Sequence, residues 1–292
     1  MGLFDSLKSM FNSGGRINIH DRFELLREAI SGTMSDFFLS RDKVSGKTVG
    51  LKILNIEKTE AVEGRFKSLN KPSEGEVGLS LKHPLIVETY EHGITNKGEQ
   101  YIVMEFLDGP GMNSLIIGRD PKLKGKRLSL LRQAAEALAF VHKSGYIHRD
   151  ICPRNYVCSK DLNTVKLIDF GLTLPAKPEF MQPGNRVGTP NYMAPEVVRR
   201  KKTDHRVDIF AFGVMAFELY AFELPFPRGN ATGTAALNHD TLEPKPIMQF
   251  CPTINATLAN AIRQCLNPAP EQRPQSMEEF LKLIADVQDD AV

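Results

Sequence analysis

Residues 148–155 read HRDICPRN, residues 169–171 read DFG and residues 194–196 read APE. The first two segments contain two carboxylates and one amide suited to a single phosphoryl transfer, namely Asp150, Asn155 and Asp169. Asp150 can take or orient the proton of an attacking hydroxyl group, and the other two residues can hold Mg²⁺ against the transferred phosphate. Each segment alone is a weak signal, but together they predict a phosphotransferase.

A fourth segment strengthens this prediction, because residues 49–52 read VGLK in a strand-like context that ends on Lys52. The four segments together resemble those of the eukaryotic-like (Hanks-type) protein kinase family, serine/threonine type, and the resemblance covers roughly residues 21–287. It implies an α+β, bilobal fold in which a small β-rich lobe with one helix and a larger helical lobe enclose ATP. The expected divisions are an N-terminal segment and linker at 1–20, a small lobe with the hinge at 21–108, a large lobe at 109–287 and an acidic tail at 288–292.

The resemblance assigns catalytic roles residue by residue. In this family the strand lysine, here Lys52, binds the α- and β-phosphates and pairs with a glutamate of the small-lobe helix. Glu74 is the expected partner because it lies ten residues before Pro84, and Glu76 is the alternative. The Thr189 hydroxyl is expected to contact the catalytic aspartate, and Met193 to line an apolar pocket for the residue after the phosphoacceptor. The complete set of implied catalytic residues is Asp150, Lys52, Glu74, Arg149, Arg154 and Thr189.

The phosphate-binding loop departs from the family pattern, since its three glycine positions fall at Ile30, Gly32 and Ser35. Bulkier residues bring backbone amides less close to a phosphate than glycine does. Gly50 stands where the family usually has alanine and Phe37 where it has valine, so the larger ring is expected to compensate for the missing methyl group. The implied nucleotide-binding residues are Ile30, Ser31, Gly32, Thr33, Met34, Ser35, Phe37, Gly50, Lys52, the gatekeeper Met104, and the hinge residues Glu105 and Leu107.

The catalytic loop also departs from the pattern, at Cys152, where serine/threonine kinases normally carry a lysine that touches the γ-phosphate. Loss of that cation is expected to cost on the order of 10²–10³ in rate, by analogy with loss of one oxyanion-hole donor. Two interpretations of Arg154 stay open: it replaces the missing lysine, or it lies near the substrate residue two positions before the phosphoacceptor. The second would favour an acidic substrate residue.

The activation segment contains no Ser, Thr or Tyr between Thr173 and Thr189. In many relatives Arg149 pairs with a phosphate in this segment, and here it has no acceptor at the usual place. We expect the segment to be ordered by packing instead, with Phe180 and Met181 buried as an apolar anchor.

The resemblance implies an ATP- and Mg²⁺-dependent protein kinase, with Mn²⁺ as an alternative metal ion, that acts on Ser and Thr of protein substrates. The main alternative is a pseudokinase, a nucleotide-binding or scaffolding module with little turnover. Cys152, the eroded glycine loop, and Gly78 and Thr89 in the stack linking the lobes favour the pseudokinase. The retained catalytic and metal-binding residues argue against it, and residues 189–196 disfavour a small-molecule kinase.

Composition limits the function classes. The chain has 292 residues, 41% of them apolar and 25% charged, and a net charge of +2 that gives no argument for nucleic-acid binding. The four cysteines show neither metal-ligand spacing nor a C-x-x-C pair, which favours reduced thiols in a cytoplasmic protein. No apolar run reaches 18 residues, so no transmembrane segment is expected.

Residues 3–11 are expected to form a short amphipathic helix, and residues 1–6 fit an N-myristoylation pattern. The segment either docks on its own domain or frays in solvent, or it contacts a partner or a membrane surface. Strands are expected at 36–41, 48–54, 87–91 and 100–106. Helices are expected at 70–82, entered through Pro72, and at 128–143, 206–221, 256–265 and 276–287.

Overall fold

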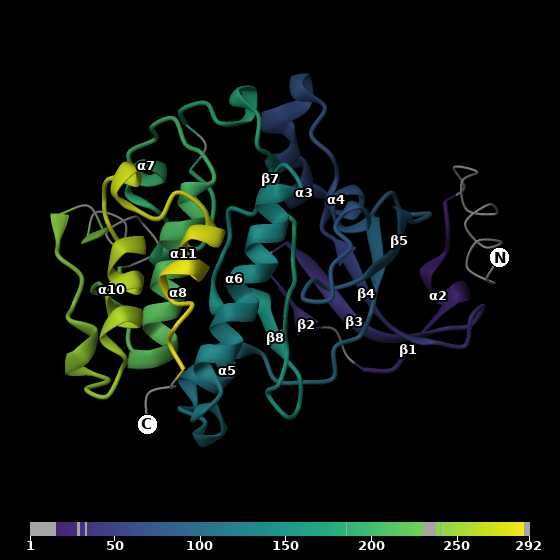
Figure 1. Ribbon diagram of the computed structural model, residues 1–292. Coiled ribbons are helices and arrows are strands. Elements are labelled where there is room, and N and C mark those ends of the chain that lie inside the picture. Colours follow the sequence, from purple (N-terminus) through teal and green to yellow (C-terminus); the bar gives the residue numbers. More distant parts are fainter. Residues whose placement is uncertain are drawn as a thin grey trace.

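The computed structural model describes residues 16–27, 30–32, 34–184, 186–229, 238–239 and 241–288, without the side chains of Ser31 and Lys67. It consists of a small lobe that carries a β-sheet and a larger, mainly helical lobe (Figure 1). This arrangement matches the predicted α+β, bilobal fold class. The amphipathic segment expected at 3–11 lies outside the described residues, as does most of the expected tail.

The sheet of the small lobe has the strand order β1-β3-β4-β6-β5, with β2 paired to β3, and all of its pairs are antiparallel. Its strands are β1 (Phe23–Leu25), β2 (Ile30–Ser31), β3 (Ser35–Asp42), β4 (Thr48–Leu54), β5 (Thr89–Ile94) and β6 (Gln100–Met104). The strand predicted at 87–91 begins later, because the Val87 amide donates to Leu167 O of the large lobe at 3.0 Å. The predicted strand 100–106 ends at Met104, where the chain enters the hinge.

The helices of the small lobe are α2 (Ile19–Arg22), α3 (Ile56–Glu63), the 3₁₀ helix η1 (Gly64–Leu69) and α4 (Glu74–Ser80). The expectation of one helix was therefore too simple. The prediction that Pro72 forms the first turn of α4 was also wrong. Ser73 is the N-cap, and its side chain and that of Glu76 form a reciprocal capping box that starts the helix at Glu74.

The large lobe is built around α8 (Arg206–Ala221), in which every residue after Arg206 is buried. A helix that is apolar on all sides is stable only when other elements surround it. The elements α6 (Arg127–Lys143), η5 (Pro190–Tyr192), η6 (Ile247–Gln249) and α10 (Ala256–Cys265) pack against it. The other elements of this lobe are α5 (Met112–Ile117), η2 (Pro121–Leu123), η3 (Pro153–Asn155), η4 (Pro178–Phe180), α7 (Pro195–Val198), η7 (Pro270–Gln272), α11 (Met277–Leu283), and two two-stranded sheets, β7 (Tyr146–Ile147)–β10 (Leu174–Pro175) and β8 (Tyr156–Cys158)–β9 (Val165–Leu167).

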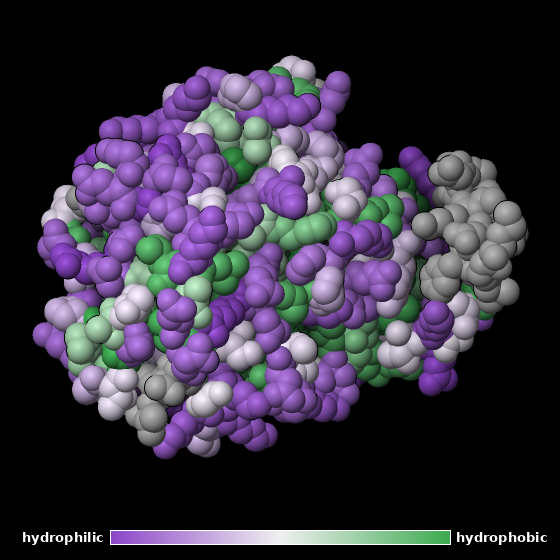
Figure 2. All heavy atoms as spheres, in the orientation of Figure 1, coloured by the Kyte–Doolittle hydropathy of each residue, from purple (hydrophilic) through white to green (hydrophobic). Residues whose placement is uncertain are grey.

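Two long-range contacts fix the far end of this lobe. Glu196 and Arg273 form a buried ion pair with an Nη1–Oε1 distance of 2.7 Å. Arg132 donates to the carbonyls of Ile284 and Val287, so α11 ends at Leu283 rather than continuing to 287 as predicted. Within the described ranges no helix is long and apolar enough to cross a membrane. In the view of Figure 2 hydrophilic residues dominate, and apolar residues gather in small groups on both lobes.

Candidate active site

A cleft of about 690 Å³ lies where the two lobes meet. Predicted site residues from both lobes line it: Gly32, Met34, Ser35, Lys52, Glu74, Asp150, Arg154, Asn155, Asp169 and Thr189. Among the described residues, Phe37, Gly50, Met104, Glu105 and Leu107 are not part of this lining. The cleft therefore gathers the groups expected to act on phosphate, metal ion and hydroxyl.

Lys52 joins the two lobes at the centre of the cleft. Its Nζ lies 2.5 Å from Glu74 Oε1 and 2.9 Å from Asp169 Oδ1. Burial by itself would lower the pKa of Lys52, but the two carboxylates outweigh this effect and raise it, so the ammonium group stays charged. The contact with Glu74 is the one predicted, whereas the alternative partner Glu76 is exposed and caps its own helix.

Asp169 is open to the cleft, with 44% of its side chain exposed. Desolvation opposes its ionisation, but the charge and hydrogen bond of Lys52 prevail and lower the pKa of Asp169 to about 2. Its backbone has a φ of 67°, a left-handed conformation that non-glycine residues rarely adopt. The carboxylate is thus ionised at neutral pH, as a divalent cation requires of its oxygen ligands.

The catalytic loop is positioned by Asp208, which lies in the first turn of α8 and is fully buried. Its two carboxylate oxygens accept hydrogen bonds from the amides of His148 and Arg149, each at 2.7 Å. His142 Nε2 lies 2.9 Å from the same carboxylate. These bonds stabilise the left-handed φ of 69° at Arg149, a strained conformation that surrounding structure must hold in place.

Asp150 contacts the other predicted groups directly. Its Oδ1 accepts hydrogen bonds from Thr189, at 2.7 Å from the hydroxyl and 2.9 Å from the amide, and its Oδ2 accepts one from Asn155 Nδ2 at 3.0 Å. Because the amide nitrogen of Asn155 is used in this way, its oxygen remains as a ligand for a metal ion. No group of three or more His, Cys, Asp or Glu residues suited to a metal ion occurs in the described part of the chain. Asn155 and Asp169 therefore fit Mg²⁺ only if phosphate oxygens share the coordination, which is how Mg²⁺ is usually bound.

The phosphate-binding loop offers few groups to a phosphate, as its sequence indicates. Ile30 is 73% exposed, and the Gly32 amide donates to Ser35 O at 2.8 Å within the β2–β3 turn. Thr33 and the Ser31 side chain lie outside the description. The Gly32 amide is thus already used within the loop, which offers a phosphate less than a glycine-rich loop does.

The Phe37 ring fills the space beside Gly50, in agreement with the expected compensation. A Cβ atom on Gly50 would lie 2.8 Å from Phe37 Cζ and 3.2 Å from Met104 Cγ. Alanine therefore does not fit at this position without a shift of the ring.

The hinge is tied to the large lobe by a contact that the sequence did not predict. The Glu105 carboxylate forms an ion pair with Lys166 of β9 and accepts a hydrogen bond from the Glu88 amide at 2.7 Å. The Glu105 amide donates to Glu88 O at 2.9 Å. Because Lys166 and Glu105 are 61 residues apart, no local pattern signals their contact.

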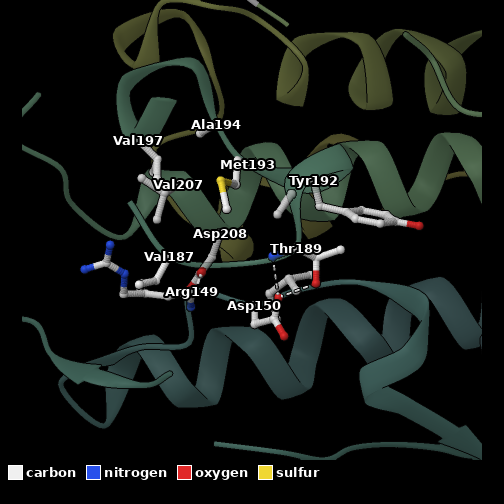
Figure 3. Close-up of a pocket in the computed structure, with 12 residues that line it drawn as sticks. Arg149, Asp150, Val187, Thr189, Tyr192, Met193, Ala194, Val197, Val207 and Asp208 are labelled. Carbon is white, nitrogen blue, oxygen red and sulfur yellow. Dashed lines mark hydrogen bonds between the residues drawn. The ribbon is translucent and has the colours of Figure 1, made fainter. Parts of the chain in front are cut away.

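A small apolar pocket, hereafter the apolar pocket, adjoins Asp150 and Thr189 and has a volume of about 20 Å³. Its apolar lining is Ile151, Val187, Met193, Ala194, Val197, Val207 and Ala211. Figure 3 shows Met193 pointing into this group, while the Tyr192 ring points to the opposite side of Thr189. The predicted position of Met193 in an apolar pocket agrees with this arrangement, but the pocket has room for only a very small group.

The activation segment is anchored by aromatic packing between lobes. Phe180 is 2% exposed, and its ring centroid lies 5.9 Å from that of Phe66 in η1 of the small lobe. Met181 is also buried, as predicted. The sequence does not predict Phe66 as the partner of Phe180. The segment that contains Phe66 shows no apolar pattern, and it lies more than a hundred residues before Phe180.

Comparison with known proteins supports the resemblance. A family model described as "Protein kinase domain" matches residues 23–283. Serine/threonine-protein kinase pkn2 of Myxococcus xanthus is 30% identical over 274 residues, 90% of this chain and 32% of that protein. Pkn3 of the same organism is 31% identical over 261 residues (85% and 47%), and PknB of Mycobacterium leprae is 30% identical over 270 residues (90% and 42%). The chain thus spans about a third to a half of the length of these curated relatives.

Proposed function

The chain belongs to the protein kinase family, and on this premise we propose that it transfers the γ-phosphate of ATP to Ser or Thr hydroxyl groups of protein substrates. Members of this family use ATP with a divalent metal ion, and we propose Mg²⁺ as that ion. The observation that carries the proposal is the bridge from Lys52 to both Glu74 and Asp169, in the cleft that Asp150 also lines. The names of the bacterial serine/threonine kinases that the chain resembles support the same reaction.

In the proposed reaction Asp150 orients the substrate hydroxyl and takes its proton as the hydroxyl oxygen bonds to the γ-phosphorus, while the bond from that phosphorus to the β,γ-bridging oxygen breaks and ADP leaves. The Thr189 hydroxyl, 2.7 Å from Asp150 Oδ1, keeps that carboxylate in place. Lys52 binds the phosphates that are not transferred, while Glu74 fixes the direction of its ammonium group. Asn155 and Asp169 would hold the metal ion, which neutralises charge on the phosphates when bound.

Cys152 favours the second candidate, a nucleotide-binding pseudokinase. Its thiol is 1% exposed, and burial raises its pKa to about 11, so it stays neutral and cannot replace the usual lysine. Lys52, which would bind the phosphates of ATP, keeps its contacts with Glu74 and Asp169. The pseudokinase therefore predicts nucleotide binding with little turnover.

A radiolabel transfer assay separates the two candidates. The protein is incubated with labelled ATP, a generic Ser/Thr protein substrate and either Mg²⁺ or Mn²⁺, in parallel with the Asp150→Asn variant. The kinase proposal expects label on Ser and Thr that the variant abolishes, with unchanged nucleotide affinity. Equal incorporation in both proteins, or binding without transfer under either metal ion, contradicts it.

A further inference from the structure

Four consecutive cations follow α7 on the surface of the large lobe. Arg199, Arg200, Lys201 and Lys202 are all exposed, and residues 199–202 are called the basic loop below. The whole chain has 37 basic and 35 acidic residues. Without the basic loop 33 of these 37 basic residues remain against 35 acidic ones, so the rest of the chain has a small acidic excess. The positive excess of the chain is therefore concentrated in this loop.

The backbone holds the basic loop in one conformation. The Arg200 amide donates to Val197 O at 3.1 Å and the Lys201 amide to Glu196 O at 2.9 Å, which is the Schellman pattern at the end of a helix. Arg200 takes the left-handed position of this motif, with a φ of 53°, where glycine is the usual residue. Since α7 has only four residues, its dipole is too small to account for four cations. The cation at Arg200 is thus kept where the backbone favours glycine.

A cleft of about 470 Å³ adjoins the basic loop. Its lining combines Arg199, Lys201 and Lys202 with residues 268–271. The buried ion pair of Glu196 with Arg273 joins these two segments, and Arg273 Nη2 also donates to Pro268 O at 3.2 Å. Because both segments are fixed in this way, the cleft exists before a ligand binds, which lowers the entropic cost of binding.

The acidic groups near the basic loop balance little of its charge. Glu196 is paired with Arg273, and Asp204 is paired with Arg206 at 2.6 Å. In the described lining of the cleft, Glu271 is left as an exposed carboxylate against three cations. Across the described ranges of the chain the side chains at 200–202 form no ion pair. The cleft therefore presents a net positive charge to solvent.

We propose that the basic loop and its cleft form a docking site for an acidic segment of a partner protein. Arginine and lysine provide the donors that carboxylate and phosphate oxygens accept, and clusters of such residues bind acidic or phosphorylated segments. A concave, preformed site suits the side chains of an extended polypeptide. The site goes beyond the proposed function, because it shares no lining residue with the catalytic cleft.

Two other anionic partners fit this site less well. A basic cluster anchors a protein stably to a membrane when an acyl chain or an amphipathic helix adds a second contact. The N-terminal segment with the sequence for such a contact precedes α2, and α2 and α7 lie at opposite ends of the molecule (Figure 1). Single-stranded nucleic acid stacks on aromatic side chains, and the lining of this cleft contains none. An acidic polypeptide is the partner that the site favours.

Fluorescence anisotropy with the full chain tests the docking site. A labelled peptide in which Glu alternates with Ala is compared with peptides that carry Gln or phosphoserine in place of Glu. The Glu peptide should bind about tenfold more tightly than the Gln peptide at low ionic strength, as three exposed charge pairs allow. The difference should shrink as salt is raised, because exposed charges are screened. Equal affinity for all three peptides would overturn the proposal, and a preference for phosphoserine over Glu would assign the site to phosphorylated segments.

Charge-reversal variants locate the binding. Lys201→Glu/Lys202→Glu should lower the affinity for the Glu peptide at least about tenfold, because two attractions become repulsions. Lys97→Glu/Lys124→Glu is the matched control, since it changes the net charge equally at two exposed lysines elsewhere, and should lower the affinity less than about twofold. Equal losses in the two double variants would show that the peptide responds to net charge alone, and the assignment to the basic loop would fail.

A further variant separates charge from folding. Glycine suits the φ of 53° at position 200, so Arg200→Gly should keep or raise the melting temperature while it weakens binding of the Glu peptide. Unchanged affinity in both Arg200→Gly and Lys201→Glu/Lys202→Glu would contradict the proposal.

The same variants decide between classes of partner. Vesicles of phosphatidylserine with phosphatidylcholine, and a DNA duplex, are tested beside the Glu peptide. Tighter binding of either one, lost in Lys201→Glu/Lys202→Glu, would replace the acidic polypeptide by a membrane or by nucleic acid and reject the proposal. Because these measurements need no phosphotransfer, their outcome is independent of the proposed kinase activity.

Discussion

The large lobe and the small lobe contribute to the active site by different means. In the large lobe a buried polar network holds the catalytic loop, with Asp208 accepting from the His148 and Arg149 amides at 2.7 Å. In the small lobe the contacts around the nucleotide side depend on glycines that face larger residues. A Cβ on Gly50 would lie 2.8 Å from Phe37, and a Cβ on Gly78 would lie 2.4 Å from the Thr89 hydroxyl.

This difference shows how the chain keeps the site despite its departures from the family pattern. At Gly78, which lies in the expected stack between the lobes, the Thr89 hydroxyl occupies the space that a side chain would use. The large lobe tolerates Cys152 because its neighbours are held by Asp208 and not by this side chain. We therefore expect substitutions in the large lobe to act through lost hydrogen bonds or packing, and those in the small lobe through steric overlap.

The largest effect on activity is expected from substitutions where the two lobes meet, at Lys52 and Asp169. Asp169→Ala and Lys52→Met should each lower phosphotransfer at least about 10³-fold, because they remove a metal ligand or the cation on the phosphates. Circular dichroism of the same preparations should remain near the wild-type spectrum, since the Asp169 side chain is 44% exposed and the Lys52 ammonium group contacts Glu74 and Asp169 in the cleft rather than the apolar core. Activity near wild type in either variant would exclude the proposed assignments.

The next largest effect, on stability, is expected at the contact between the lobes that Phe66 and Phe180 form. Phe180→Ala should lower the free energy of unfolding by about 3–5 kcal/mol, the usual range for a buried phenylalanine. Phe250→Ala is the control, because its ring is 38% exposed and should cost much less. Urea unfolding measures both. The double variant Phe66→Ala/Phe180→Ala should be less destabilised than the sum of the single variants, and strict additivity would show that the rings do not interact.

Much of this architecture was predictable from local sequence. The observed bounds of β4, α8 and α10 equal the predicted ranges 48–54, 206–221 and 256–265, because each has an uninterrupted apolar pattern between clear ends. The missed helix α3, at 56–63, is mostly polar and exposed and gives no such pattern. The predicted start of α4 was wrong because a capping box of Ser73 and Glu76, a spacing that the sequence already contains, starts the helix, and Pro72 does not.

The contacts of the candidate site likewise fall into those that the sequence predicts and those that it does not. The Lys52–Glu74 and Asp150–Thr189 contacts could be predicted because family motifs mark both partners. Three further contacts join residues that are far apart in the sequence and meet only in the folded chain, so no local pattern predicts them: Glu105–Lys166, Phe66–Phe180 and Tyr192–Glu218. Gly78 and Thr89 are both unusual residues for their positions. Whether a larger side chain at position 78 would stabilise or destabilise the protein depends on the 2.4 Å between a Cβ there and the Thr89 hydroxyl, which only the structure gives.

A smaller effect on stability is expected at Gly78 in the small lobe, where steric overlap should dominate. Gly78→Ala should destabilise the protein by about 1–2 kcal/mol, because overlap with Thr89 costs about 1–3 kcal/mol and the better helix propensity of alanine offsets part of it. Activity should fall further than stability, since α4 carries Glu74. Adding Thr89→Ala to this variant should restore both the melting temperature and the rate. Failure of that rescue would mean that the Thr89 hydroxyl is not the obstacle.

The smallest effect is expected from removal of phosphate, because the activation segment has packing where many relatives have a phosphorylated residue. No hydroxyl residue lies between Thr173 and Thr189, Thr173 is fully buried, and Thr189 is bonded to Asp150. Phe180 and Met181 anchor the segment instead, and Asp208 fixes the Arg149 backbone without help from an anion. Protein treated with a broad phosphatase and checked by intact mass should therefore keep its initial rate within about twofold, since no charge-assisted contact is removed. A large loss that returns when a residue within 169–196 is rephosphorylated would show that packing alone does not order the segment.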